Sequence, residues 1–155
     1  MPTGVKISGL YTTSILAKTE ALAAGFDEAI LLNQDGSVSE GSGENLFMIR
    51  DGVINTPSET DNCLLGITRD SVIQLAKDEL GLEVVQRHIH RSELYLADEV
   101  FLTGTAAHLT SVGELDNRNI GTGETGPITK KLQDSYFSTV VGDNERYLDW
   151  CTMVT

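Results

Sequence analysis

The chain has 155 residues, of which 40% are apolar, and its 11 basic and 23 acidic residues give a formal net charge of −12. This length and composition suit one globular domain with its own core, and the acidic excess argues against nucleic acid as a partner, because phosphate binding requires clustered Lys and Arg. No apolar run is long enough to span a membrane, and the start shows no signal-peptide pattern. The two cysteines form neither a metal-ligand spacing nor a disulfide framework. We therefore expect a single domain over residues 1–155 in a reducing, cytoplasmic setting.

The first part of the chain predicts a helix followed by two hairpins. Apolar residues near helical spacing predict a helix over residues 11–24, which Gly25 ends. Two Asp-Gly pairs, at 35–36 and 51–52, are typical of tight turns between antiparallel strands. The predicted strands on either side of these turns cover residues 28–33, 37–40, 45–50 and 53–56.

The second part contains the most regular helical pattern, over residues 68–80, with Thr68 as its expected cap and Gly81 as its stop. The remaining elements are a strand at 82–90, a short helical turn at 92–97, a strand at 99–103, a strand pair around 110–115, and a closing helix from near Pro127 to 141. Strands and helices do not alternate strictly, so we predict an α+β fold built on antiparallel strands.

Few segments of the chain carry a recognisable chemical motif. There is no phosphate-binding Walker loop, no zinc spacing and no nucleophile elbow. Two glycine-rich patches occur at 40–45 and 104–107, and Gly66-Ile67-Thr68 opens the best helix. A helix start offers free backbone N–H groups to a phosphate. Most helix starts bind no anion, however, so this feature alone is weak.

Four motifs in a fixed order carry a resemblance to a known family. The motifs are Lys6-x-x-Gly9-x-Tyr11, Ser39-Glu-Gly-Ser-Gly-Glu-Asn-Leu-Phe47, Gly66-Ile-Thr-Arg-Asp70 and Leu96-Ala-Asp-Glu-Val-Phe-Leu-Thr-Gly-Thr-Ala-Ala107. In order and spacing they resemble the fold-type IV aminotransferases, and most of all the branched-chain amino-acid aminotransferases. The resemblance implies the larger cofactor-binding domain of that fold, a mixed or antiparallel sheet flanked by helices, with pyridoxal 5'-phosphate as cofactor.

The resemblance also implies roles for three side chains around the cofactor ring. Lys6 matches the lysine that forms the Schiff base and later moves a proton, for which a desolvated amine is suited. Glu40 matches the carboxylate that faces the pyridine nitrogen and keeps the ring protonated. Tyr11 matches the tyrosine near the phenolic oxygen. Without the resemblance, Lys6 and Glu40 would be read as surface residues and Tyr11 equally well as a core tyrosine.

Further residues match the phosphate and substrate contacts of the family. Ile67, Thr68 and Thr105 are expected at the phosphate, and the Thr105–Ala106 turn is expected to offer backbone N–H groups to the substrate carboxylate. Small residues let the backbone approach a ligand closely. No metal site is predicted, and His88 and His90 are expected to be exposed and not ligands.

The expected reaction is transfer of an amino group between a branched-chain amino acid and 2-oxoglutarate by a homodimer or larger assembly, without nucleic acid or membrane. A D-amino-acid aminotransferase and an aminodeoxychorismate lyase remain alternatives on the same fold. The family's smaller N-terminal domain, which supplies an arginine to the phosphate, is expected to be absent, since Lys6 is preceded by five residues. A truncated, non-catalytic cofactor-binding fragment is therefore a third alternative. Leu10 and His108 replace the asparagine and the acid usual in the family.

Overall fold

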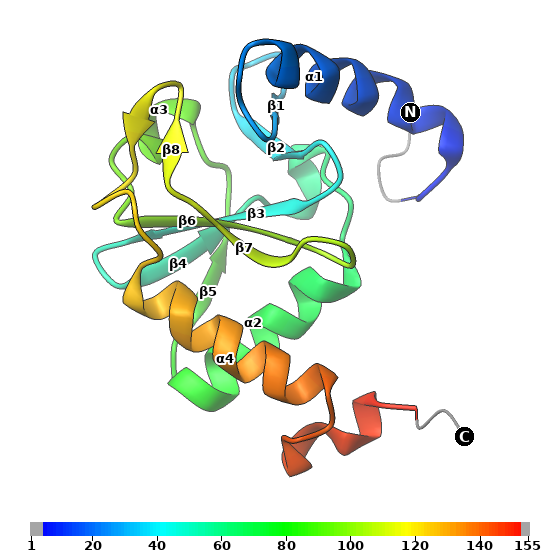
Figure 1. Cartoon of the computed structure of the whole chain (residues 1–155), viewed down its shortest axis with the longest axis vertical. Coiled ribbons are helices and arrows are strands. Elements are labelled where there is room, and N and C mark those ends of the chain that lie inside the picture. Colours follow the sequence, from blue (N-terminus) through cyan, green and yellow to red (C-terminus); the bar gives the residue numbers. More distant parts are fainter. Residues whose placement is uncertain (1–4, 153–155) are drawn as a thin grey trace.

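The computed structural model describes residues 5–152. At its centre is a five-stranded sheet of order β5-β4-β3-β6-β7, in which β4 and β5 are parallel and the other neighbours antiparallel. Its strands are β3 (Asn45–Arg50), β4 (Val53–Thr56), β5 (Val84–Gln86), β6 (Glu99–Gly104) and β7 (His108–Val112). Helices α2 (Ile67–Leu80) and α4 (Pro127–Val140) lie over one face of this sheet (Figure 1). The mixed α+β architecture agrees with the predicted fold class.

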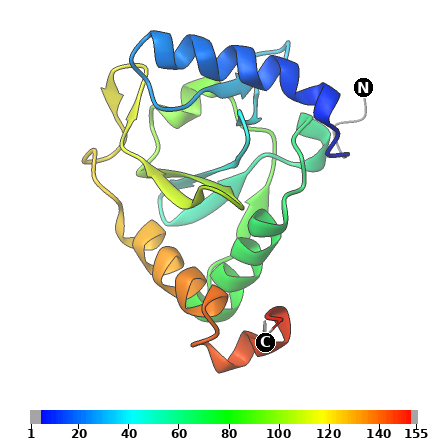
Figure 2. The same cartoon turned by 45° about the vertical axis from the view of Figure 1, so that its right-hand side comes forward.

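Smaller elements cover the opposite face of the sheet. They are β1 (Ile30–Leu32), β2 (Val38–Gly41), α3 (Arg91–Leu94), β8 (Glu114–Leu115) and β9 (Arg118–Asn119). Helix α1 (Tyr11–Ala23) lies outside this layer, beside the β1–β2 hairpin, and Figure 2 shows it crossing the end of the molecule away from α2 and α4. Three short 3₁₀ helices complete the described chain: η1 (Ser8–Leu10), η2 (Glu59–Asp61) and η3 (Glu145–Trp150).

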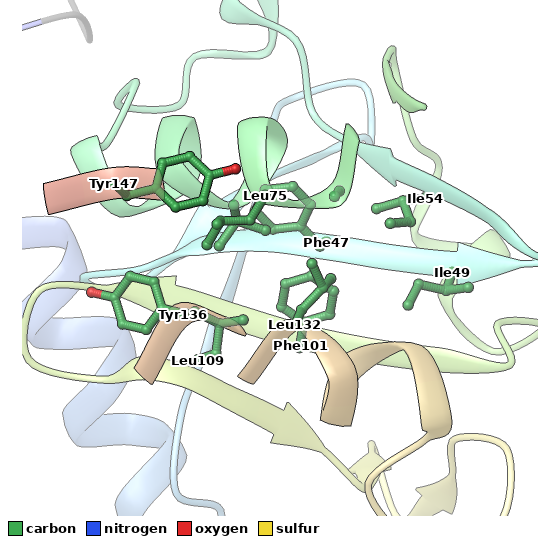
Figure 3. Packing of buried hydrophobic residues seen from close by; sticks show 11 residues of the cluster. Phe47, Ile49, Ile54, Leu75, Phe101, Leu109, Leu132, Tyr136 and Tyr147 are labelled. Atoms are coloured by element: carbon green, nitrogen blue, oxygen red, sulfur yellow. The ribbon is translucent and has the colours of Figure 1, made fainter. Parts of the chain in front are cut away.

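The central strands are apolar on both sides because both faces of the sheet are covered. In β3, Phe47 and Ile49 face the α2–α4 layer, whereas Leu46 and Met48 face the opposite layer, and all four are buried. Phe47 stacks on Phe101 of β6 with ring centroids 4.8 Å apart, and Figure 3 shows this pair between the two helices. The position of β3 between two layers therefore explains its uninterrupted apolar run.

Most predicted elements are present at or near their predicted bounds. The β3–β4 hairpin and its Asp51-Gly52 turn match the prediction residue for residue. The β1–β2 hairpin is also confirmed, with an irregular register next to Ile30. Helices α1, α2 and α4 occur where apolar periodicity predicts helices.

Three predictions at element boundaries are wrong. Helix α2 is capped by Gly66, in extended conformation, and Thr68 is a buried residue of its first turn. Strand β5 is much shorter than 82–90, because the Arg87 amide ends the pairing with β4 at the Thr56 carbonyl and Ile89 then bonds to Val38.

The strand pair predicted around 110–115 does not form as a pair: the strand breaks at Gly113, where a Cβ would overlap the Gly123 carbonyl oxygen. Strand β7 therefore ends at Val112, and β8 pairs with β9 instead. This close approach of two backbones is not visible in the local sequence.

Other features of the described residues concern the thiols, possible metal sites, membrane spans and two histidines. Cys63 and Cys151 are free thiols. Between residues 5 and 152, no group of three or more His, Cys, Asp or Glu side chains could hold a metal ion. Among the helices of that same region, none combines the length and the apolar character needed to cross a bilayer. The rings of His88 and His90 are exposed, as predicted, and His88 contacts the Asp61 carboxylate.

Candidate functional site

A cavity of about 340 Å³ opens where four separate segments of the chain meet. These segments are the stretch before and into α1, the end of β2, the start of α2 and the end of β6. Six of the predicted site residues line it: Lys6, Tyr11, Glu40, Ile67, Thr68 and Thr105. Ala106, the seventh, follows Thr105 in the turn after β6 and is exposed, but it is not part of the lining.

Each element brings its side chain to the cavity through local structure. Glu40 is in β2, whose position is set by the tight hairpin with β1. Ile67 and Thr68 are the first two residues of α2. Thr105 follows Gly104, the last residue of β6, while Lys6 precedes α1 and Tyr11 begins it. The site is thus assembled from the ends of elements around the central sheet.

Glu40 is a partly buried carboxyl group with one backbone partner. Its Oε2 accepts a hydrogen bond from the Leu64 amide at 2.8 Å. Burial raises the pKa of Glu40 above its ordinary value; the Leu64 amide acts in the opposite direction, and the nearby charge of Glu44 raises it further. Within residues 5–152 no basic side chain forms an ion pair with Glu40. The site is therefore suited to a ligand whose protonated nitrogen donates a hydrogen bond to this carboxylate.

The start of α2 presents backbone donors to the cavity. The first backbone N–H that bonds back into the helix is that of Asp70, to the Gly66 carbonyl. The amides of Ile67 and Thr68 therefore belong to the set that a helix leaves without intrahelical partners. Together with the partial positive charge at a helix N-terminus, they favour an anion such as a phosphate.

Asn45 is a buried side chain of the cavity wall that the sequence did not single out. Its Nδ2 donates to the Leu64 carbonyl at 2.5 Å, and its Oδ1 accepts from the Gly66 amide at 3.2 Å. Asparagine is disfavoured in strand interiors. Its place at the start of the apolar run of β3, within the Ser39–Phe47 motif, is the sequence signal that could identify it.

Two further cavity residues also escape the sequence-based prediction. Thr103 is buried, and its hydroxyl has no hydrogen-bond partner among the described residues. Glu44 is partly buried; burial raises its pKa, although the Gly43 amide donates to it at 3.0 Å. Both residues lie within the family motifs, but only their three-dimensional neighbours show that they face the cavity.

Glu44 also adjoins a second acidic group outside the cavity. The amine of Lys18 lies 2.6 Å from Glu28 Oε2. The pKa of Glu28 is lowered: burial raises it, but hydrogen bonds from Lys18, Ser42 and the Ala29 amide lower it by more. Helix α1 is therefore tied to the β1–β2 hairpin, and through Glu44 to the cavity, by a small charged cluster.

The fold, together with a lysine, a carboxyl group and a helix N-terminus on one cavity, agrees with comparison to known families. Residues 2–115 match the family described as amino-transferase class IV. The chain belongs to the class IV aminotransferases.

Relatives within that family include branched-chain-amino-acid aminotransferases. A probable enzyme of this name from Aquifex aeolicus is 59% identical over 154 residues, which is 99% of this chain and 50% of the relative. The Pseudomonas aeruginosa enzyme is 49% identical over 98% of this chain and 49% of its own length. This chain thus spans about half the length of the curated relatives that it matches.

Solved structures show the same relationship. The T.th. branched-chain amino acid aminotransferase complexed with N-(5'-phosphopyridoxyl)-L-glutamate superposes with a TM-score of 0.96 at 51% identity, covering 100% of this chain and 52% of that chain. The Thermobaculum terrenum enzyme in its PLP form gives a TM-score of 0.95 at 44% identity, over 98% of this chain and 50% of that one. The fold is therefore that of the corresponding half of a fold-type IV branched-chain aminotransferase.

Proposed function

We propose that this chain forms the cofactor-binding part of a branched-chain amino-acid aminotransferase and binds pyridoxal 5'-phosphate in the cavity. The observation that carries the proposal is the convergence of Lys6, Glu40 and the start of α2 on one cavity of about 340 Å³. Solved relatives support it, since one is complexed with N-(5'-phosphopyridoxyl)-L-glutamate and another is in its PLP form. We infer that residues 1–155 act as one domain in this role.

The residues present fit such a cofactor chemically. Glu40 has no basic partner in the described region and a pKa raised by burial, so a ring nitrogen bearing a proton would satisfy it. Ile67 and Thr68 offer backbone donors for a phosphate. The Thr103 hydroxyl is buried at the same cavity, with no partner among the described residues. Buried polar groups of this kind normally have partners, so a polar ligand is expected there.

The bound cofactor would supply an electron-withdrawing ring that stabilises negative charge at the substrate Cα. Lys6 would hold the cofactor through its amine and, once substrate has displaced it, would act as the base that moves a proton between the substrate Cα and the cofactor C4′. Glu40 would keep the ring nitrogen protonated, and the Tyr11 hydroxyl would donate to the phenolic oxygen. Ile67, Thr68 and Thr105 would hold the phosphate.

We propose transfer of an amino group between a branched-chain amino acid and 2-oxoglutarate, with the backbone of Thr105 and Ala106 binding the substrate carboxylate. The substrate class rests on the names of the relatives. Because the chain spans about half of those relatives, turnover would need the remaining half, from a longer chain or a second polypeptide.

We also propose self-association, most simply as a symmetric dimer, and a cytoplasmic location. Several large apolar side chains of α1 are exposed, including Ile15, Leu16 and Leu22, and large bare apolar patches are uncommon on soluble monomers. The free thiols Cys63 and Cys151 suit a reducing compartment.

The test supplies the remaining half from a related enzyme and measures which substrate the resulting protein prefers. The N-terminal part of a related branched-chain aminotransferase is fused to this chain or added in trans. Glutamate formation from 2-oxoglutarate is followed with L-leucine or D-alanine, and pyruvate release is followed with aminodeoxychorismate. We expect L-leucine to be preferred, Lys6→Ala to abolish turnover and Lys77→Ala to retain it. A preference for D-alanine or aminodeoxychorismate would assign the chain to another branch of the family.

A further inference from the structure

Three side-chain hydrogen bonds fix the backbone of a short segment between the cavity and α2. This segment is Leu64–Gly66. Its Leu64 amide donates to Glu40 Oε2 at 2.8 Å, and its Leu64 carbonyl accepts from Asn45 Nδ2 at 2.5 Å. Its Gly66 amide donates to Asn45 Oδ1 at 3.2 Å. Asn45 therefore bonds both a carbonyl and an amide of the same segment, much as a neighbouring strand would.

The position of Asn45 in the fold makes this contact rigid. Asn45 is the first residue of β3, pairs with Thr103 of β6, and is only 6% exposed. At Gly66 an added Cβ would lie 2.5 Å from Asn45 Oδ1, so the close contact requires glycine at this position. The buried central sheet is thereby connected directly to the residue before α2.

This contact controls where the donors of α2 lie relative to Glu40. Gly66 is the residue before α2, and the amides of Ile67 and Thr68 follow it directly. Leu64, two residues earlier, bonds to Glu40. A change in the Leu64–Gly66 backbone would therefore move the helix start and the Glu40 partner together.

We propose that Asn45 is a positioning residue that sets the distance between the phosphate donors at the start of α2 and the carboxylate of Glu40. The inference rests on the proposed function, because it assigns those two groups to opposite ends of one cofactor. Asn45 itself acts through the backbone of Leu64–Gly66. Its contribution is to keep donors and carboxylate in place before the cofactor arrives, which lowers the ordering cost of binding.

The test separates a role toward the phosphate from a merely structural role. Binding of pyridoxal 5'-phosphate and of pyridoxal, which lacks the phosphate, is measured by absorbance titration of the 155-residue chain. The variants are Asn45→Ala and the nearly isosteric Asn45→Asp, which retains an acceptor for Gly66 but cannot donate to the Leu64 carbonyl when ionised. The second variant keeps the test open if the first does not fold.

Asn55→Ala is a matched control. Asn55 is also a buried asparagine, 5% exposed, on a strand of the same sheet. It donates to the Val53 carbonyl at 3.1 Å and accepts from Arg87 Nε at 2.8 Å, but it does not line the cavity. Its loss therefore costs a similar pair of hydrogen bonds without touching the site.

We expect both Asn45 variants to bind pyridoxal 5'-phosphate about tenfold more weakly, the scale expected when one or both of these hydrogen bonds are lost, while pyridoxal affinity changes far less. The Asn55→Ala variant should keep the wild-type ratio of the two affinities. Equal losses for both ligands, or an unchanged ratio in the Asn45 variants, would show that Asn45 has no role toward the phosphate. Wild-type protein that binds neither ligand would instead overturn the proposed function itself.

Discussion

Glu40 is a carboxyl group whose surroundings in residues 5–152 provide a hydrogen-bond donor but no compensating positive charge. If a protonated ring nitrogen is its missing partner, Glu40→Gln should leave cofactor binding largely intact. Proton removal from the substrate should slow by about a hundredfold, the scale expected when one preorganised electrostatic group is lost. Rapid-mixing absorbance with L-leucine and the completed protein measures this step, with the exposed Glu83→Gln as control. A full rate in Glu40→Gln would mean that Glu40 is not the partner of the ring.

Asp61 is a second buried carboxylate, and its role is structural. Its carboxylate accepts hydrogen bonds from the Ser58 amide and hydroxyl, and it contacts the His88 ring at 2.7 Å. The pKa of Asp61 is lowered: burial raises it, but the hydrogen bonds to Ser58 and His88 lower it by more. These contacts tie the loop before α2, which carries Leu64, to the segment that follows β5.

The lowered pKa of Asp61 gives a pH dependence with a defined sign. A carboxylate with a lower pKa in the folded state stabilises the fold above the ordinary aspartate value of about 4, and this stabilisation is lost as the pH falls through the folded value. Asp61→Asn should therefore unfold at a lower temperature than wild type at neutral pH. The difference should shrink in thermal melts recorded below about pH 4. A difference that stays constant down to strongly acidic pH, or one equal to that of the exposed Asp143→Asn, would contradict this account.

At the residue scale, sequence motifs identify the groups expected to contact the ligand and miss those that support them. Motifs assign Glu40 and Thr105 to the site, and the structure places both on the cavity. They do not assign Asn45 and Thr103, because the importance of these residues depends on contacts between distant segments. The bond from Asn45 to Gly66, for example, joins residues that are 21 positions apart. The sequence around Asn45 gives no indication that Gly66 lies beside it in the fold.

Helix α4 depends on a side chain from another element for its start. Glu99, at the beginning of β6, is buried, and its two carboxylate oxygens accept from the Ile128 amide at 3.0 Å and the Thr129 amide at 2.7 Å. Gly126, before the helix, approaches Glu99 so closely that a Cβ there would overlap the carboxylate. A carboxylate at this end also complements the helix dipole.

Replacing this cap should lower the stability of the fold. In Glu99→Gln one of the two acceptors becomes a donor that faces a backbone N–H, so we expect a loss of about 1–3 kcal/mol, typical of an unsatisfied buried group. Urea unfolding of Glu99→Gln and of the exposed Glu124→Gln measures the difference. Equal unfolding midpoints for the two variants would show that Glu99 does not cap α4.

Elements are predictable where local chemistry alone determines them. The β3–β4 hairpin follows from an apolar run and an Asp-Gly turn, and its predicted bounds are correct. The predicted strand β5 is too long because its end depends on which strand the backbone pairs with next. The cap of α4 by Glu99 and the break at Gly113 are not predictable, since both arise from close approaches between distant parts of the chain.

At the scale of the whole molecule, α1 is the least buried of the α-helices in residues 5–152. It has no buried residue, and Ile15, Leu16 and Leu22 are 61%, 65% and 56% exposed. The periodicity predicts this helix correctly but cannot show whether its apolar side chains face this core or another surface. Together with the partial coverage of the relatives, this exposure is the basis for expecting self-association.

The proposed self-association can be tested by adding charge to α1. Sedimentation velocity at micromolar concentration should show a dimer or larger species for wild type, and Leu16→Glu should shift it toward monomer, because a buried charge at an interface is costly. Leu96→Glu is the control, since Leu96 is 60% exposed but lies outside α1. Monomeric wild type, or equal effects of the two substitutions, would contradict an interface over α1.

The most direct test of the proposed site concerns the covalent attachment of the cofactor. The purified 155-residue chain is mixed with pyridoxal 5'-phosphate, reduced with borohydride and digested, and the modified peptide is identified by mass spectrometry. Lys6 should carry the label, an absorbance band of the bound cofactor should precede reduction, and Lys6→Ala should give neither. Label on Lys18, Lys77, Lys130 or Lys131 in place of Lys6, or no label at all, would contradict the assignment of this cavity as a pyridoxal 5'-phosphate site.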